Sequence, residues 1–278
     1  MIQLVAIDLD GTLFNPRQEI TDTNKQAIQK AIESGIKIVI VTGRGQRGVE
    51  RALAALEMDL PYICSAGSLA RERRDGPILY AHPFHHPTEI RHVIAFAQRA
   101  GVGLIADTPH GISLWFGPDA LEEVMDPMSA ADARKSVRTF APEKDFDQPL
   151  LKLTIAAEME LLMQAEKIVR ENCPSIYQTY SGLTYIDMTG QNVNKGAALK
   201  ALAAHWNLQS EEIAAIGDQA IDLEMLKYAG LPIAMANAVD ALKQSAKWIA
   251  PSNEEDGVAW ALERIMQENT IHIGTNIP

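Results

Sequence analysis

A short apolar run near the start of the chain, "VAIDLDGT", constrains the fold more than any other feature. The residues from Gln3 to Ile7 predict a buried strand, and Asp8 and Asp10 follow it, one residue apart. Because residues i and i+2 of a strand point to the same side, both carboxylates could converge on one ligand past the strand's end. Two such acids repel each other unless a cation lies between them, and Gly11 lets the backbone turn sharply. The run therefore predicts a cation site at the carboxyl edge of an open α/β sheet.

The pattern around this run repeats. Residues 1–66 alternate short apolar runs with amphipathic helical stretches, and the same alternation returns from residue 196, where "EIAAIGD", "LPIAMA" and "WIA" predict strands. This alternation is typical of a parallel sheet with helical crossovers. Helices are expected after a Thr21 cap, over 46–56, over 196–206 and over 258–266, followed by a loose tail from about 268. The predicted fold class is α/β, with a Rossmann-like parallel sheet as its core.

The middle of the chain has a different texture. Between about 82 and 188, prolines interrupt segments that predict strands and at least two long helices. A length of 278 residues fits roughly two domains. We therefore expect an inserted α+β domain over 82–188, with the core formed by residues 1–81 and 189–278.

The balance of charge restricts the partners of this chain. With 25 basic and 36 acidic residues the formal net charge is -11, which disfavours nucleic acid and anionic membranes. The only cysteines, Cys64 and Cys173, are too few for a disulfide scaffold. The sequence shows neither a leader nor an apolar run long enough to span a bilayer. We therefore expect a cytoplasmic protein, a monomer or a homodimer, that binds a small molecule.

The segment "TGRGQRG" follows a second predicted strand. Thr42 offers a hydroxyl at the strand end, and Gly43 lies beside a helix N-terminus whose N–H groups favour phosphate. The three glycines, Gly43, Gly45 and Gly48, also match the dinucleotide fingerprint G-x-G-x-x-G. That fingerprint needs an acid at the end of the next strand, and this sequence has none there. Phosphate binding is therefore favoured over dinucleotide binding.

Two later segments add charged residues to the predicted site. "NKG" places Lys195 at the start of a helix, where its ammonium could reach a phosphate. "IGDQAID" ends a strand in Asp218, with Asp222 one turn into the following helix. Together with Asp8 and Asp10, these acids would gather at one edge of the sheet. Because Mg²⁺ takes carboxylates, waters and phosphate oxygens as ligands, this edge predicts a magnesium site.

The order of these motifs, D-x-D-G-T, T-G-R, K-G and G-D-x-x-x-D, resembles the haloacid dehalogenase (HAD) superfamily. The insert, between the threonine and lysine motifs, is similar in position to the α/β cap of Cof-type phosphatases. The ending "SNEEDGVAWALERI" is similar to that subfamily too. The resemblance spans almost the whole chain, although the insert matches only in placement and size. It implies a HAD-like core with a cap that selects the substrate.

The resemblance also implies a role for each site residue. Asp8 would be the nucleophile that forms an aspartyl-phosphate, and Asp10 would protonate the leaving oxygen and later activate water. The groups that bind the phosphoryl oxygens would be Gly11, Thr42, Gly43 and Lys195. The ligands of Mg²⁺ would be Asp8, the backbone carbonyl of Asp10, and Asp218. Asp222 would support these ligands, and Arg44 is a candidate substrate contact.

Three residues depart from the family's pattern. Ala66 and Ile221 stand where relatives usually have asparagine, and Ala236 replaces a usual glycine. None is a core catalytic group, so they bear on substrate contacts and rate. The sequence therefore predicts a Mg²⁺-dependent hydrolase of small phosphorylated metabolites, sugar phosphates first and nucleotide or flavin mononucleotides second. The alternatives are a phosphomutase of the same superfamily, a nicotinamide-dinucleotide-binding oxidoreductase and a non-catalytic HAD-like binding protein.

Overall fold

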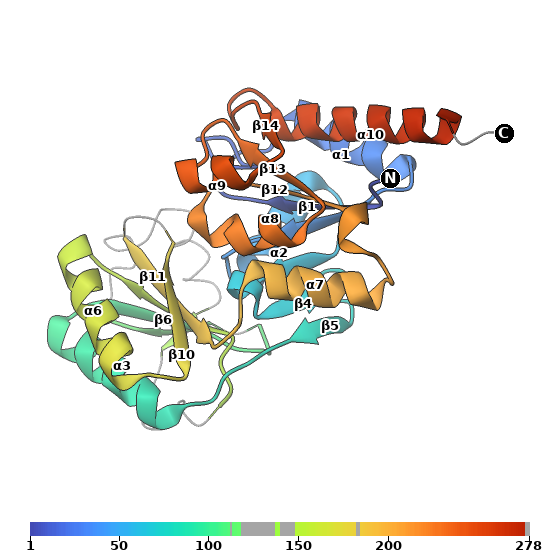
Figure 1. Ribbon diagram of the computed structural model, residues 1–278. Coiled ribbons are helices and arrows are strands. Elements are labelled where there is room, and N and C mark those ends of the chain that lie inside the picture. The colour runs from blue at the N-terminus through green and yellow to red at the C-terminus, as the bar shows by residue number, and fades with distance from the viewer. Residues whose placement is uncertain (112, 118–136, 140–147, 182–183, 276–278) are drawn as a thin grey trace.

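The structure, a computed structural model, contains two β-sheets (Figure 1) and describes residues 1–111, 113–117, 137–139, 148–181 and 184–275. The larger sheet has eight strands in the order β14-β13-β12-β1-β2-β3-β4-β5. The smaller sheet has six strands in the order β10-β11-β9-β6-β7-β8. All strands of the smaller sheet come from residues 103–190, between β5 and β12 in the sequence.

The larger sheet is parallel from β14 to β3, and β4 and β5 are added antiparallel. Its strands are β1 (Leu4–Asp8), β2 (Lys37–Val41), β3 (Tyr62–Cys64), β4 (Leu69–Arg71), β5 (Ile78–Ala81), β12 (Ile213–Gly217), β13 (Leu231–Met235) and β14 (Trp248–Ala250). The predicted α/β fold with a parallel sheet core is confirmed.

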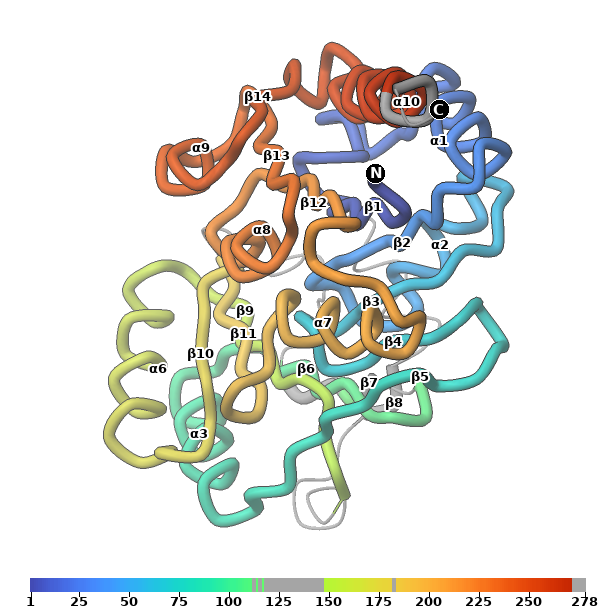
Figure 2. Tube along the Cα trace, turned by 45° about the vertical axis from the view of Figure 1, so that its right-hand side comes forward, coloured from blue at the N-terminus to red at the C-terminus, as the bar shows by residue number. Residues whose placement is uncertain are grey.

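Helices cover both faces of this sheet (Figure 2). One face carries α1 (Asp22–Glu33), α2 (Gln46–Leu56) and α10 (Gly257–Thr275). The other carries α7 (Lys195–His205), α8 (Leu223–Tyr228) and α9 (Asp240–Ser245). The chain builds the sheet in one direction from β1 to β3 and in the opposite direction from β12 to β14. The strand order therefore reverses between β1 and β12, and open α/β sheets bind ligands at such a reversal.

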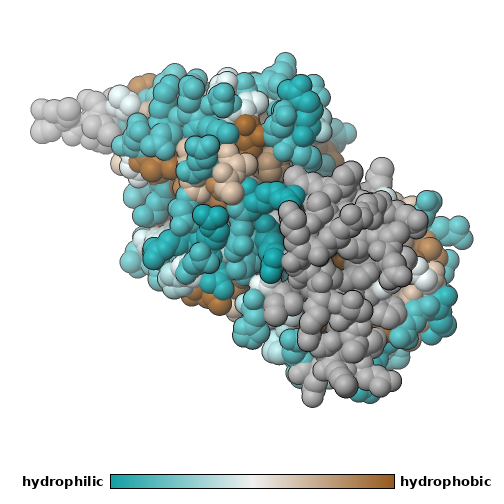
Figure 3. Space-filling model, turned by 180° about the vertical axis from the view of Figure 1, so that it is seen from behind, coloured by the Kyte–Doolittle hydropathy of each residue, from teal (hydrophilic) through white to brown (hydrophobic). Residues whose placement is uncertain are grey.

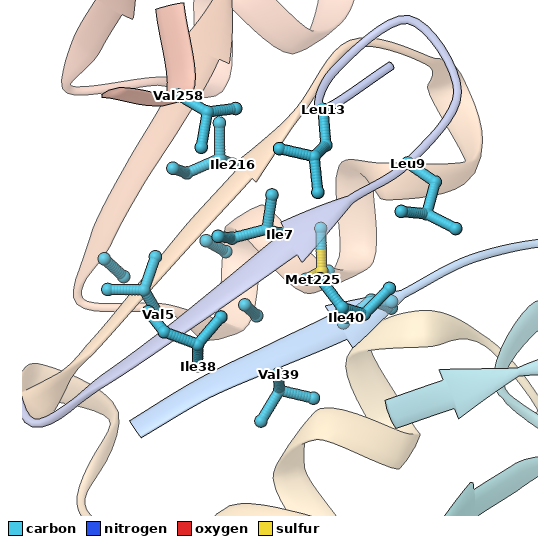
Figure 4. Packing of buried hydrophobic residues seen from close by; sticks show 14 of the residues in the cluster. Val5, Ile7, Leu9, Leu13, Ile38, Val39, Ile40, Ile216, Met225 and Val258 are labelled. Carbon is cyan, nitrogen blue, oxygen red and sulfur yellow. The ribbon is translucent and has the colours of Figure 1, made fainter. Parts of the chain in front are cut away.

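The hydrophobic core lies on both faces of the central strands. Val5 and Ile7 of β1 have no exposed surface, because a central parallel strand is covered on both sides. Figure 4 shows aliphatic side chains of the central strands packed with Met225 of α8 and Val258 of α10, which lie on opposite faces. Burial of each large aliphatic side chain stabilises the fold by about 1.5–3 kcal/mol. This packing fixes the end of β1, where Asp8 lies.

The smaller sheet has its own core, formed with α3 (Pro87–Ala100) and α6 (Met159–Asn172). Its strands are β6 (Gly103–Asp107), β7 (Ser113–Phe116), β8 (Val137–Thr139), β9 (Lys152–Ala156), β10 (Ile176–Tyr180) and β11 (Tyr185–Gly190). Since β5 ends at Ala81 and β11 runs on to Gly190, the proposed cap boundaries at 82 and 188 stay a prediction.

The end of the chain differs from the sequence expectation of a loose tail from about 268. The helix α10 continues to Thr275, well beyond the predicted end at 266. Asn269 accepts a hydrogen bond from the backbone N–H of Ile2 and donates one to its carbonyl. These contacts hold the last turns of the helix against the start of the chain, which local periodicity could not reveal.

The surface is described in part. On the face in Figure 3, the described residues are mostly hydrophilic, with apolar residues in small patches among them, as is usual for protein surfaces. No helix in the described ranges combines the length and apolarity that a membrane span needs.

Candidate active site

Three parallel strands bring predicted site residues to one edge of the larger sheet. β1 ends at Asp8, β2 ends at Val41 directly before Thr42, and β12 ends at Gly217 directly before Asp218. Asp8 pairs with Val41 in the register of β1 and β2. Asp8, Thr42 and Asp218 therefore meet at the point where the strand order reverses, as the sequence led us to expect.

Lys195 lies at the centre of this edge. It is the first residue of α7, whose N-cap Asn194 accepts a hydrogen bond from the backbone N–H of Ala197. Although Lys195 is 1% exposed, its Nζ lies 2.6 Å from Asp8 Oδ1 and 2.5 Å from Asp222 Oδ1. Burial lowers the pKa of Lys195, but the charges of Asp222 and Asp8 outweigh it and raise the pKa overall. The lysine is therefore a permanent positive charge beside Asp8.

Asp222 contacts both Lys195 and the turn that follows β12. Its Oδ1 accepts the hydrogen bond from Lys195, and its Oδ2 accepts the backbone N–H groups of Asp218, at 3.1 Å, and Gln219, at 3.0 Å. It has no exposed surface. Asp222 thus fixes both the lysine and the turn that follows β12.

Both carboxylate oxygens of Asp218 accept hydrogen bonds. Its Oδ1 accepts the hydroxyl of Thr12 at 3.0 Å, and its Oδ2 accepts the side-chain amide of Gln219 at 2.9 Å. Gly11 has φ +78°, and a Cβ there would collide with the carboxylate of Asp218. Only glycine combines this backbone conformation with so close an approach. Gly11 thereby allows the loop after β1 to contact Asp218, in line with the sharp turn expected there.

Three buried acids cluster at this edge of the sheet. Oxygen atoms of Asp8, Asp218 and Asp222 lie within 4.8 Å of one another. Burial, and then the charge of Asp222, raise the pKa of Asp8 well above its ordinary value and that of Asp218 to about 6. Three carboxylates thus face one ammonium, a charge imbalance that a buried divalent cation would offset. An all-oxygen donor set fits Mg²⁺.

Asp10 lies outside this buried cluster. Its carboxylate accepts two hydrogen bonds from Arg44, from Nε at 2.8 Å and from Nη2 at 2.6 Å. The same Nη2 donates to Gln18, and the guanidinium lies over the ring of Phe14. The expectation that Asp8 and Asp10 point together assumed strand geometry through Asp10, but β1 ends at Asp8. Arg44, the candidate substrate contact, here binds Asp10.

The loop after β2 lies between the two sheets. Thr42 is fully buried, and its Oγ1 accepts the backbone N–H of Arg44 at 3.1 Å. The carbonyl of Gly43 accepts a hydrogen bond at 2.8 Å from Lys152 on β9 of the smaller sheet. The smaller sheet therefore touches the predicted phosphate-binding loop directly.

A buried polar cluster on the smaller sheet was missed by the sequence reasoning. Asp187 Oδ1 accepts the hydroxyl of Thr154 at 2.5 Å and lies 3.2 Å from Lys152 Nζ. The segments "LKLTIA" and "TYIDMTG" alternate polar and apolar residues, a signal that could have indicated a polar face on these strands.

A small pocket also lies between the two sheets, near the start of α2. Ser65 donates a hydrogen bond to Asp107 on its wall at 3.4 Å. The lining residues are Gln46, Arg47, Ser65, Asp107, Thr108, Gly111 and Leu151. No predicted site residue lines this pocket, so it is separate from the cluster around Asp8.

The three departures from the family's pattern have distinct surroundings. Ala66 is buried with φ +57°, a left-handed conformation that asparagine adopts more readily than alanine. Ile221, in the short helix η4 (Ala220–Asp222), is half-buried, and its Cδ1 faces Gly43. Ala236 is exposed directly after β13.

Comparison with known families is consistent with this geometry. The family model described as haloacid dehalogenase-like hydrolase matches residues 5–262, which include both segments of the larger sheet and the insert between them. The chain belongs to the haloacid dehalogenase-like hydrolases. The resemblance inferred from the motifs is therefore confirmed.

Several relatives of this chain are phosphatases by name. A 5-amino-6-(5-phospho-D-ribitylamino)uracil phosphatase of Bacillus subtilis is 28% identical and is aligned over 95% of this chain and 98% of its own length. A putative phosphatase of Streptococcus pyogenes is 30% identical, with the same coverage of both chains. With the family match, these relatives make the chain a HAD phosphatase, a phosphoric monoester hydrolase.

Solved structures share the fold over almost the whole length of this chain. A haloacid dehalogenase-like hydrolase from Bacteroides thetaiotaomicron has a TM-score of 0.83 and 25% identity, covering 95% of this chain and all of its own. The structure of a sugar phosphatase of HAD subclass IIB has a TM-score of 0.81 at 22% identity, over 95% of this chain and 98% of its own. This second likeness bears on the fold alone.

Proposed function

We propose that this protein is a Mg²⁺-dependent phosphatase that hydrolyses phosphorylated sugars and sugar alcohols through an aspartyl-phosphate on Asp8. The observation that carries the proposal is the buried bridge that Lys195 forms between Asp8 and Asp222, with Asp218 beside it. A carboxylate is a poor nucleophile towards an anionic phosphate ester unless positive charge offsets the repulsion. The ammonium of Lys195 supplies part of that charge.

Mg²⁺ would be held by Asp8, Asp218 and the backbone carbonyl of Asp10. When bound, the ion would neutralise part of the negative charge on the phosphoryl oxygens. The hydrogen bonds of Asp222 to Lys195 and to two backbone N–H groups support a positioning role for this residue. Gly11, Thr42, Gly43 and Lys195 would bind the phosphoryl group.

The reaction proceeds in two steps. The carboxylate of Asp8 forms a bond to phosphorus while the bond from phosphorus to the ester oxygen breaks, and Asp10 gives its proton to that oxygen. Asp10 then takes a proton from a water molecule whose oxygen attacks phosphorus, and the bond to Asp8 breaks as inorganic phosphate forms. Both oxygens of Asp10 accept hydrogen bonds from Arg44, so Asp10 must separate from Arg44 to act.

The names of the relatives support the substrate class. Three Bacillus subtilis relatives are named 5-amino-6-(5-phospho-D-ribitylamino)uracil phosphatases, at 24 to 29% identity. Their named substrate is a phosphate ester of a ribityl group, which is a sugar alcohol. We therefore place sugar and sugar-alcohol phosphates first and other small phosphomonoesters, including mononucleotides, second.

A screen of phosphorylated metabolites for phosphate release, with Mg²⁺ and with excess EDTA, tests the proposal. We expect release with Mg²⁺ only, and a loss of at least about 10³-fold in Lys195→Met. Lys200→Met, an exposed lysine one and a half turns along the same helix, is the matched control and should retain full activity. Full activity in excess EDTA would contradict the metal requirement. Isomerised product that keeps its phosphate would indicate a phosphomutase, and no turnover would indicate a binding protein.

A further inference from the structure

One carboxylate of the smaller sheet, that of Asp187, has an oxygen that accepts no hydrogen bond from the described residues. Asp187 is 2% exposed, and its Oδ1 is occupied by Thr154 and Lys152. Among the residues that the structure describes, Asp187 Oδ2 has no hydrogen-bond partner. This oxygen is not fully enclosed, so a hydroxyl group of a ligand could reach it and donate a hydrogen bond to it.

This oxygen faces a small space above Gly43. A Cβ built on Gly43 would lie 3.9 Å from Asp187 Oδ2 and 3.9 Å from Ile221 Cδ1, and apart from the chain neighbours Thr42 and Arg44 no described residue is nearer. The space is therefore bounded by a hydrogen-bond acceptor on one side and an apolar group on the other. Gly43 follows Thr42, and Ile221 precedes Asp222, so the space adjoins the proposed phosphoryl site.

The charges around this space select against anions. The ammonium of Lys152 donates to the carbonyl of Gly43 and lies against Asp187 Oδ1, so it is already engaged. Asp107 and Asp187 are both buried, and Lys152 is the ammonium whose charge they share. The positive charge of Lys152 is therefore already shared between carboxylates of the protein, and it is not free to pair with a second anionic group of a substrate.

We propose that Asp187, held in place by Lys152 and Thr154, determines specificity by accepting a hydrogen bond from a hydroxyl of the substrate's organic group. The preferred substrate is then a monophosphate of a polyhydroxylated compound with no second phosphate or carboxylate. This inference rests on the proposed function and narrows its substrate class. It assigns the selection to a residue of the smaller sheet, remote in sequence from every catalytic motif.

The test compares three esters by kcat/KM: ribitol 5-phosphate, n-pentyl phosphate, which has the same chain length without hydroxyls, and ribulose 1,5-bisphosphate. The wild-type enzyme should prefer ribitol 5-phosphate to pentyl phosphate by about tenfold or more, the scale of a hydrogen bond to a charged group. In Asp187→Asn, the remaining carbonyl can still accept from Thr154 and Lys152, but an N–H₂ group replaces the free acceptor. The preference for ribitol 5-phosphate should disappear, and the bisphosphate should gain relative to pentyl phosphate.

Asp107→Asn is the matched control, since it makes the same change in a buried carboxylate of the same sheet that faces Ser65 and Gly45 instead. This variant should keep the preference for ribitol 5-phosphate. Equal losses on all three esters in Asp187→Asn, with unchanged ratios, would overturn the proposal, as would a wild-type enzyme without the preference. If Asp187→Asn does not fold, Thr154→Val must reduce the preference, and an unchanged preference overturns it. No turnover of any ester by the wild type would overturn the proposed function, and this inference with it.

Discussion

Replacement of Asp218 by asparagine should stabilise the protein when no metal is present. Burial and the charge of Asp222 raise the pKa of Asp218 from 3.8 to about 6, which corresponds to about 3 kcal/mol against the charged form at neutral pH. Asparagine removes the charge but can accept only one of the hydrogen bonds from Thr12 and Gln219, a loss of about 1 kcal/mol. The net gain in the free energy of unfolding is therefore about 1–2 kcal/mol, or a rise in Tm of a few degrees.

Thermal unfolding in EDTA as a function of pH measures this gain. Because the pKa of Asp218 is raised in the folded state, its unfavourable contribution is absent below about pH 4 and complete above about pH 7. The variant's advantage should therefore be largest at pH 7.5 and vanish towards pH 4. Asp75→Asn, an exposed acid in the turn before β5, gives the same change in net charge and should leave Tm unchanged. Excess Mg²⁺ should raise the Tm of the wild type more than that of Asp218→Asn. A variant less stable than the wild type in EDTA at pH 7.5 would refute the reasoning.

Two further predictions concern residues near the proposed reaction. Asp10→Asn should lose far more activity on esters with poor leaving groups than on aryl phosphates, because a good leaving group needs little protonation. Steady-state rates across a series of leaving groups would measure this difference. Equal losses on all esters would count against Asp10 as the acid. Ile221→Asn should raise kcat/KM on a small generic ester by about tenfold if the amide donates a hydrogen bond in the transition state. Since Ile221 is half-buried against Gly43, this variant should keep its Tm, and a lower Tm without a gain in rate would show that the isoleucine serves packing.

The positions of Asp8, Thr42 and Asp218 at one edge could be predicted from the sequence for a simple reason. Each follows an apolar run, and the carboxyl ends of parallel strands meet at the same edge. Lys195 was predicted from its place at a helix start, but its bridge between Asp8 and Asp222 depends on how α7 packs against the sheet.

Other features depended on contacts between distant segments. The hydrogen bonds from Arg44 to Asp10 depend on where β1 ends. The local sequence pattern defines the end of a strand only to within a residue or two. The contact of Lys152 with Gly43 joins two sheets across 109 positions of sequence, so strand periodicity alone could not place Asp187 near the phosphate loop. The anchoring of Asn269 on Ile2 links the two ends of the chain in the same way.

The central claim is that a phosphoryl group is transferred to Asp8, and the most direct test is to trap that enzyme form. Asp10→Asn should slow hydrolysis of the intermediate, so this variant, mixed with an aryl phosphate and Mg²⁺ and quenched in acid, should accumulate it. Mass spectrometry of tryptic peptides should then find one hydroxylamine-labile phosphoryl group on the peptide that spans residues 1–17. The double variant Asp8→Asn with Asp10→Asn should carry none. A phosphoryl group on any other peptide, or turnover by Asp8→Asn at a rate near that of the wild type, would contradict the account.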